Sequence, residues 1–201
     1  SKALERLQAG ELDLNGPIYS TPKRLGQATF SPPFCRIPVG ALWRKKPCAT
    51  LPALPKPEKF EEIMGRGYEV AVLTDTSSHH FALTVLGLPS SRIIVCSSPL
   101  ECLERLTLSG IARPAHLIIV DAPIARTLEQ KHSNDIEAIF CNPTNALGYF
   151  ENSIAIRPDW PELEQFISQT LKYLGSERTM QELVRRHVAK EVQGLVVGRA
   201  R

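Results

Sequence analysis

A cluster of hydroxyl side chains follows an apolar run at residues 69–73, where a strand is expected to end. The segment 74–78 reads Thr-Asp-Thr-Ser-Ser, and Thr, Ser and Asp are residues that commonly begin a helix. Backbone N–H groups at a helix start attract anions, and the hydroxyls of Thr76 and Ser77 add further donors. The pattern favours an anion-binding turn at Thr76 and Ser77. The alternative is that both residues serve only as helix caps.

An acidic residue stands at a similar place later in the chain. Asp121 directly follows the apolar run at residues 117–120, and a helical segment begins at Ala122. Open α/β sheets place their ligands at the carboxyl ends of the strands. Asp121 therefore has the position and the charge to accept hydrogen bonds from a ligand ammonium group. The alternative is that it caps the helix that follows.

The elements that position these residues alternate regularly between strands and helices. Apolar runs predict strands at 69–73, 93–95, 117–120 and 137–140, with helices at 79–86, 99–108 and 122–128 between them. This alternation predicts βαβ units and a parallel sheet covered on both faces. On either side of this region the patterns are weaker: strands at 12–14, 38–43 and 153–157, helices at 4–7, 60–64, 160–173 and 179–188, and a loop at 17–33.

The composition is that of an ordinary globular protein. The chain has 201 residues, of which 43% are hydrophobic and 22% charged, enough for one mid-sized domain or two small lobes. A net charge of +3, with the basic residues dispersed, does not predict nucleic-acid binding. No apolar run is long enough to span a bilayer. The five cysteines lack the spacing of a zinc site and permit one disulfide, and no cofactor is expected.

An ordered series of segments resembles bacterial solute-binding proteins of family 3, of the amino-acid type. Thr21-Pro22-Lys23-Arg24 resembles their "T-x-x-R" segment, and Phe30-Ser31-Pro32-Pro33-Phe34 resembles the "F-S-x-P-Y" segment that follows it. Residues 70–77 resemble the strand and carboxylate-binding turn of the second lobe. Residues 149–157 resemble the "Y-G-I-A" strand that crosses back between the lobes, and the helices after Pro161 resemble the C-terminal pair.

This resemblance implies a two-lobed α/β fold of the type II periplasmic-binding-protein class, with parallel-sheet lobes and a two-strand hinge. Lobe 1 is expected to comprise residues 1–43 and 152–201, and lobe 2 residues 44–151. The N-terminal strand, helix and strand of lobe 1 in the family have no counterpart in this sequence. The chain also departs from the family at Asp75, where the family has glycine, and at His116, where it has aspartate.

The resemblance also implies a ligand site and a role for each residue in it. Arg24 would hold a ligand carboxylate, since a guanidinium fork suits that group. Thr76 and Ser77 would assist it, Asp121 would accept from an ammonium group, and Tyr19 or Phe34 would cover the apolar part. For Arg24 the alternative is an ion pair with a surface acid.

The function implied is capture of a small polar solute, an amino acid or related compound, in an interlobe cleft for ABC-type uptake. Its partners would be that small-molecule ligand and a membrane permease or receptor module. The place implied is the periplasm or the outside of the cell, with attachment to the membrane through a further segment as an alternative. Three alternatives remain: a ligand-sensing domain of a membrane signalling protein, a dehydratase-like enzyme on the same fold, and a relative that has lost ligand binding and serves protein contacts. No acid pair or nucleophile–base arrangement stands out in favour of an enzyme.

Overall fold

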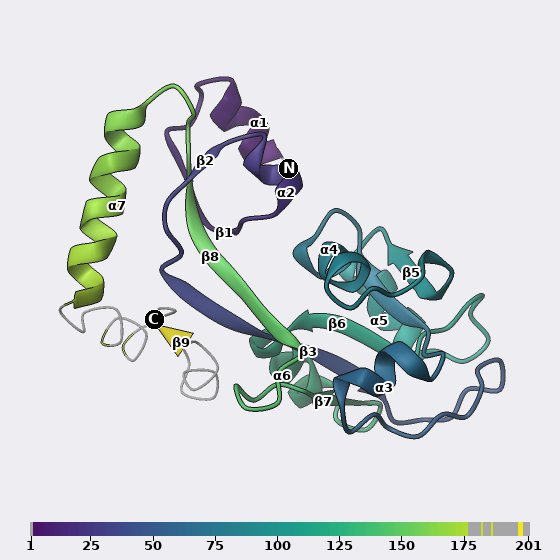
Figure 1. Cartoon of the computed structure of the whole chain (residues 1–201). Coiled ribbons are helices and arrows are strands. Elements are labelled where there is room, and N and C mark those ends of the chain that lie inside the picture. Colours follow the sequence, from purple (N-terminus) through teal and green to yellow (C-terminus); the bar gives the residue numbers. More distant parts are fainter. Residues whose placement is uncertain (1, 177–181, 183–185, 187–196, 199–201) are drawn as a thin grey trace. The chain divides into compact units, whose positions relative to one another are not determined.

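The chain forms two compact units in a computed structural model that describes residues 2–176, 182, 186, 197 and 198 (Figure 1). Unit 1 comprises residues 1–37 and 149–201, and unit 2 comprises residues 38–148. The chain passes from one unit to the other twice, and both passages lie inside strands. These strands are β3 (Cys35–Arg44) and β8 (Gly148–Ile156).

Unit 2 is built around a mixed sheet. Strand β4 (Val70–Leu73) pairs in parallel with β5 (Ile93–Cys96) on one side and with β6 (Leu117–Asp121) on the other. The parallel arrangement predicted for these three strands is confirmed. Strand β3 instead runs antiparallel to both β6 and β7 (Ile136–Ile139). The sheet, expected to be parallel, is therefore mixed where β3 joins it, because apolar composition reports burial and says nothing of strand direction.

Helices cover the sheet of unit 2. Helices α4 (Ser77–Thr84) and α5 (Pro99–Thr107) pack on β4 and β6, and α6 (Ala122–Lys131) packs on β6 and β7. A short helix α3 (Phe60–Gly65) precedes β4, and a 3₁₀ turn η1 (Ser90–Arg92) leads into β5. All four residues of β4 are apolar, and its first three are fully buried. This is expected for a strand whose two faces are both covered.

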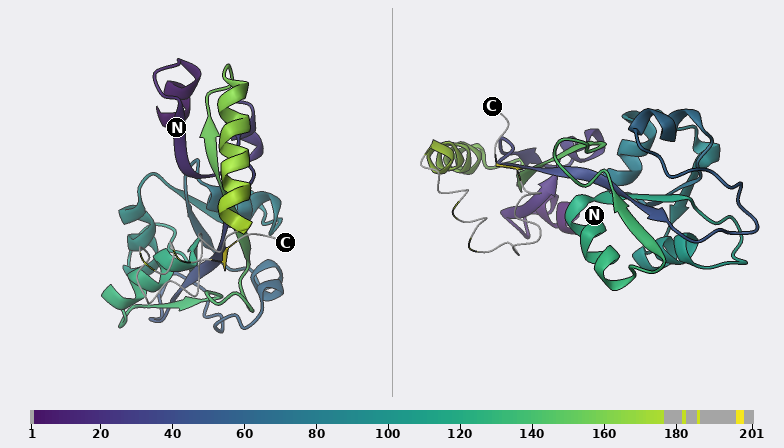
Figure 2. Two further views of the ribbon diagram at one scale, coloured as in Figure 1. Left: turned by 90° about the vertical axis from the view of Figure 1, so that its left-hand side faces the viewer. Right: turned by 90° about the horizontal axis from the view of Figure 1, so that it is seen from below.

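Unit 1 contains antiparallel pairings throughout its described residues. Strands β1 (Leu14–Tyr19) and β2 (Thr29–Phe30) both pair with β8, and β9 (Val197–Gly198) pairs with the start of β3. The parallel sheet expected for this lobe is therefore not what forms there. Between residues 2 and 176 its helices are α1 (Lys2–Gln8), α2 (Pro22–Leu25) and α7 (Pro161–Ser176). Figure 2 shows α7 as a single straight helix. Its core gathers Leu4, Leu7, Ala28 and Ala155.

The loop expected at residues 17–33 is more ordered than its composition suggests. Strand β1 runs as far as Tyr19, helix α2 begins at Pro22, and β2 occupies 29–30. Proline is well suited to a first helical turn because its φ angle is already near the helical value. The helix expected at 179–188 lies outside the described residues except at positions 182 and 186. Within the described part of the chain, no helix has the length and apolar character needed to cross a membrane.

Candidate functional site

The turn between β4 and α4 carries the hydroxyl cluster. Asp75 adopts a left-handed backbone conformation with φ of 55°, which reverses the chain before the helix. Thr76 is the N-cap of α4: its hydroxyl donates to the Leu73 carbonyl at 2.6 Å and accepts from the His79 N–H at 3.4 Å. The cap interpretation of Thr76 is thus confirmed. The Thr76 hydroxyl is already engaged within the turn, whereas its neighbour Ser77 is not.

Ser77 is the first residue of α4 and is only 5% exposed. Its hydroxyl oxygen is buried and has no hydrogen-bond partner. The N–H groups of Ser77 and Ser78 lie in the first helical turn, where no carbonyl of the helix can accept from them. A buried hydroxyl without a partner costs about 1–3 kcal/mol. The start of α4 therefore combines unmet donors with the positive end of a helix dipole, which is an arrangement suited to an anion.

Asp121 ends β6 and occupies the N-cap position of α6. Its side chain makes no capping hydrogen bond with that helix. Pro123, the second residue of α6, has no N–H to offer it. Because β4 and β6 are parallel, Asp121 and the turn after β4 lie at the same edge of the sheet. Asp121 thus stands where a helix cap would stand, but its carboxylate does not cap α6.

In unit 1, Arg24 belongs to α2 and is half-buried. Its Nη1 atom donates to the Tyr19 carbonyl at 2.8 Å. It forms no ion pair with a carboxylate of any residue that the structure describes, so the surface-acid alternative finds no partner there. Burial lowers the pKa of the Arg24 guanidinium, and the nearby Tyr19 opposes that shift. A half-buried cation with unused donors is a site prepared for an anion.

The aromatic residues expected beside Arg24 meet around one residue of β8. Tyr19 pairs with Asn152 in the β1–β8 register, and its ring lies 4.8 Å from that of Phe150. The N–H of Phe34 donates to the Asn152 carbonyl at 2.9 Å. The backbones of Tyr19 and Phe34 therefore both contact Asn152, and Arg24 reaches the Tyr19 carbonyl. Asn152, which is 4% exposed, was missed, because an asparagine inside a strand carries no signal of its contacts.

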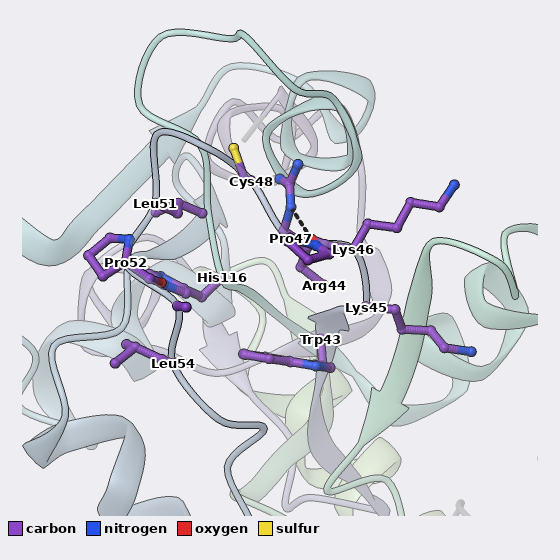
Figure 3. A pocket seen from close by; sticks show the side chains of 11 residues that line it. Trp43, Arg44, Lys45, Lys46, Pro47, Cys48, Leu51, Pro52, Leu54 and His116 are labelled. Atoms are coloured by element: carbon purple, nitrogen blue, oxygen red, sulfur yellow. Dashed lines mark hydrogen bonds between the residues drawn. The ribbon is translucent and has the colours of Figure 1, made fainter.

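Unit 2 also contains a small cavity of about 150 Å³ between the end of β3 and the loop that follows (Figure 3). This volume is below that of typical ligand pockets, which begin near ~300 Å³. Its main cation is already satisfied: the Arg44 guanidinium donates to the carbonyls of Lys46, Arg105 and Leu108. Among the residues that can be described, no three metal-ligating side chains converge on a common point.

His116 lines this cavity and is 4% exposed. Its Nδ1 atom accepts from the Glu69 N–H at 3.0 Å, and its Nε2 atom lies 3.0 Å from the Pro52 carbonyl. This pairing requires a neutral ring with the proton on Nε2. Burial lowers the pKa of His116, although the Pro52 carbonyl favours the charged form. The ring also stacks on Trp43 at 6.5 Å. His116 thus joins the loop to the sheet and has a structural role.

Comparisons with known proteins bear on the fold. Neither a protein-family model nor a curated protein sequence matches the chain. Solved structures do match. A putative ABC-transporter binding component from Wolinella succinogenes in complex with lysine aligns with a TM-score of 0.68 at 14% identity, covering 94% of this chain and 75% of that one.

Two further solved structures broaden the comparison. A histidine kinase sensor domain similar to periplasmic binding proteins aligns with a TM-score of 0.69 at 16% identity, over 98% of this chain and 75% of that one. An ancestral amino-acid-binding protein described as a precursor of cyclohexadienyl dehydratase aligns with a TM-score of 0.63 at 21% identity, covering 91% of this chain and 71% of that one. These likenesses establish that the chain has the two-lobed fold of periplasmic amino-acid-binding proteins.

Proposed function

We propose that the chain binds a free amino acid or a closely related zwitterion. The observation that carries this proposal is Arg24, a half-buried guanidinium held by one backbone carbonyl and without a carboxylate partner among the described residues. Keeping a cation away from water costs free energy unless an anion compensates it. A ligand carboxylate, bound through two parallel hydrogen bonds, meets that need better than water does.

The start of α4 supports the same ligand chemistry. The unpartnered Ser77 hydroxyl and the first N–H groups of the helix are donors, and donors suit a carboxylate. Asp121 stands at the same edge of that sheet and suits an ammonium group. Tyr19, whose carbonyl accepts from Arg24, and Phe34, whose backbone bonds to Asn152, are the proposed sources of apolar surface. The proposed ligand therefore carries both charges of an amino acid together with an apolar portion.

The solved relatives indicate which amino acids to test first. Their descriptions name lysine, arginine, glutamine and glutamate as bound ligands. These differ in side-chain charge and share only the α-carboxylate and α-ammonium groups. The proposal therefore rests on those two shared groups, and the side-chain preference is left to experiment.

The biological role proposed is solute capture for ABC-type uptake, outside the cytoplasm and together with a membrane permease. A ligand-sensing module is the second candidate, because the sensor domain of a histidine kinase aligns over 98% of this chain. Binding without turnover is proposed over catalysis. The comparison structure related to a dehydratase is itself described as an amino-acid-binding protein, so a test for turnover of each bound ligand belongs with the binding assay.

The test measures thermal unfolding of the full chain against the standard amino acids, followed by calorimetric titration of those that stabilise it. A ligand at a hundred times its Kd adds about 2.7 kcal/mol of stability. Replacing a charge-assisted bidentate contact by alanine costs about 3 kcal/mol, so Arg24→Ala should weaken binding by about two orders of magnitude.

Lys23→Ala is the matched control, because it removes one positive charge from the same helix at an exposed position. It should change the affinity less than about threefold, since an exposed charge outside the site contributes little. Equal affinity of Arg24→Ala and the wild-type chain would show that Arg24 is not the carboxylate contact. Stabilisation by no amino acid would contradict the proposed function.

A further inference from the structure

The loop after β3 covers the small cavity of unit 2. Residues 47–54, here called the covering loop, supply most of the residues that line this cavity of about 150 Å³. Hydrogen bonds fold the loop on itself: the Leu51 N–H donates to the Cys48 carbonyl at 3.1 Å, and the Cys48 sulfur lies 3.3 Å from the Thr50 hydroxyl. Because the space beneath the loop deprives it of packing contacts, its polar contact with the sheet matters more.

That contact is made by the imidazole ring of His116. The backbone of His116 is fixed beside the sheet, since its N–H donates to the Glu69 carbonyl at 2.9 Å and its carbonyl accepts from the Arg44 N–H at 3.1 Å. The ring accepts from the Glu69 N–H at Nδ1, and its Nε2 atom lies 3.0 Å from the Pro52 carbonyl. Pro52 is exposed, and Figure 3 shows it beside the ring. The ring therefore links a fixed backbone to an exposed loop.

This ring cannot accept a second proton where it lies. Its Nε2 atom carries the proton that the Pro52 carbonyl accepts, so a further proton must go to Nδ1. Two donors, Nδ1–H and the Glu69 N–H, would then face each other across 3.0 Å. His116 is also only 4% exposed, so water cannot solvate the charge. Rotation of the ring toward water relieves both costs and gives up the contact with Pro52.

The groups around the ring do not compensate its charge. The titratable ones are Arg44, Lys45 and Lys46 at and just after the end of β3, Cys48 in the covering loop, Tyr68 and Glu69 before β4, and Arg113 before β6. Burial, the largest influence, lowers the pKa of His116 together with Arg44, whereas the Pro52 carbonyl and Glu69 oppose them. The Glu69 carboxylate is already paired with Arg113 at 3.3 Å. The closed loop therefore favours the neutral ring.

Both ends of the covering loop are tied by contacts that do not involve the ring. Before the loop, the Arg44 Nε atom donates to the Lys46 carbonyl at 3.0 Å. After it, the Tyr68 hydroxyl donates to the Pro55 carbonyl at 2.7 Å, and Lys56 pairs with Glu137 at 2.8 Å. These contacts persist when His116 is protonated, so loss of the Pro52 contact frees only the middle of the loop.

We propose that protonation of His116 releases the covering loop from the sheet while the rest of unit 2 stays folded. In the open form the ring is solvated and its pKa returns to the ordinary value of about 6.5. Opening therefore takes up a proton, and the closed form loses stability as the pH falls below about 6.5. Between pH 7.5 and about pH 5.5, one proton raises the open fraction about tenfold, as long as the closed form stays neutral.

Cys48 reports the opening, because it belongs to the covering loop and is 8% exposed when the loop is closed. The reduced full chain is labelled at both pH values with dithiodipyridine, which reacts with thiols in mild acid, and each cysteine is followed by mass spectrometry after digestion. Each rate is divided by that of the same cysteine in the urea-unfolded chain at the same pH, which removes the pH dependence of the thiol chemistry.

The normalised Cys48 rate should rise about tenfold at the lower pH. Cys141, 1% exposed and in the same unit, reports global unfolding and should react about a hundredfold more slowly than Cys48 at both pH values. This comparison is made within the wild-type chain and so does not depend on the folding of any variant. Equal rates of Cys48 and Cys141 would overturn the proposal, because the loop would then open only when the whole unit unfolds.

Matched variants test the role of the histidine. His116→Gln keeps an acceptor and a donor but cannot gain a proton, so its normalised Cys48 rate should change less than about twofold between the two pH values. His80→Gln is the control, because it removes another histidine of unit 2, on α4, and should keep the tenfold rise. A wild-type Cys48 rate that is the same at both pH values, or an equal rise in His116→Gln, would refute the release of the loop by His116.

Discussion

Substitution of Ser77 by alanine is expected to raise stability and lower affinity at once. In the free protein the Ser77 hydroxyl is buried and has no hydrogen-bond partner. Removing it relieves a desolvation cost of about 1–3 kcal/mol, and alanine is also the better helix former by a few tenths of a kcal/mol. The variant loses little packing, because only one small oxygen is deleted. We expect a net gain of about 1 kcal/mol, or roughly 3 °C in Tm.

In the ligand complex the same substitution acts in the opposite direction. If the hydroxyl donates to a ligand carboxylate, its loss removes a hydrogen bond to a charged group, which contributes about 1.5–3 kcal/mol. Affinity should then fall between about tenfold and a hundredfold. Opposite effects on stability and affinity are the signature of a residue kept for binding at a cost in stability.

Urea unfolding of the ligand-free chain and calorimetric titration of the stabilising amino acid measure the two effects separately. Ser78→Ala is the control, because Ser78 follows on the same helix but is more exposed; it should alter each quantity by less than about 0.5 kcal/mol. A Ser77→Ala variant less stable than wild type would show that the hydroxyl is satisfied after all. Unchanged affinity would remove Ser77 from the site.

Two further predictions concern the interior of unit 2. His116→Ala should cost about 2–3 kcal/mol at pH 7.5, since it leaves the Glu69 N–H and the Pro52 carbonyl without their partner. Because burial lowers the pKa of His116, unfolding takes up a proton as the pH falls below about 6.5. Below about pH 6.5, the free energy of unfolding of the wild-type chain should therefore fall more steeply with pH than that of His116→Ala. Urea unfolding at pH 7.5 and below pH 6.5 measures this difference. An equal decline in both proteins would contradict a buried, neutral His116. Gly40→Ala should lower the free energy of unfolding by about 2–3 kcal/mol, because its Cβ would lie 2.6 Å from the Cys141 sulfur. Adding Cys141→Ala to the same chain should restore part of this stability. If the effects of the two substitutions on thermal unfolding were strictly additive, the clash would be refuted.

Most of the elements around the candidate site could be predicted from the sequence. Three parallel strands were predicted from the apolar runs of β4, β5 and β6 and from the helical segments between them. Consecutive apolar residues indicate a strand that is buried on both faces. The position of Thr76 as a helix cap follows equally from its neighbours. Where a feature depends on residues close in sequence, the sequence was sufficient.

Strand direction and the fine structure of unit 1 were not predictable in this way. Strand β3 pairs with β6 and β7 through residues far apart in the chain, and nothing in its own composition distinguishes antiparallel from parallel pairing. The segment between β1 and β3 carries many loop-forming residues, yet pairing of β2 with β8 orders it. Long-range hydrogen bonds decided these features, because they satisfy backbone groups that local preference leaves open.

The sequence by itself determined the chemical types available for binding: a guanidinium at Arg24, hydroxyls at Thr76 and Ser77, and a carboxylate at Asp121. Only the tertiary structure decided which of these groups are already satisfied. It engages Thr76 within its turn and leaves Ser77 buried without a partner. It gives Arg24 one backbone carbonyl and no carboxylate among the described residues. The reason is that a side chain's chemistry belongs to the residue, whereas its burial and partners belong to segments that meet only when the chain folds.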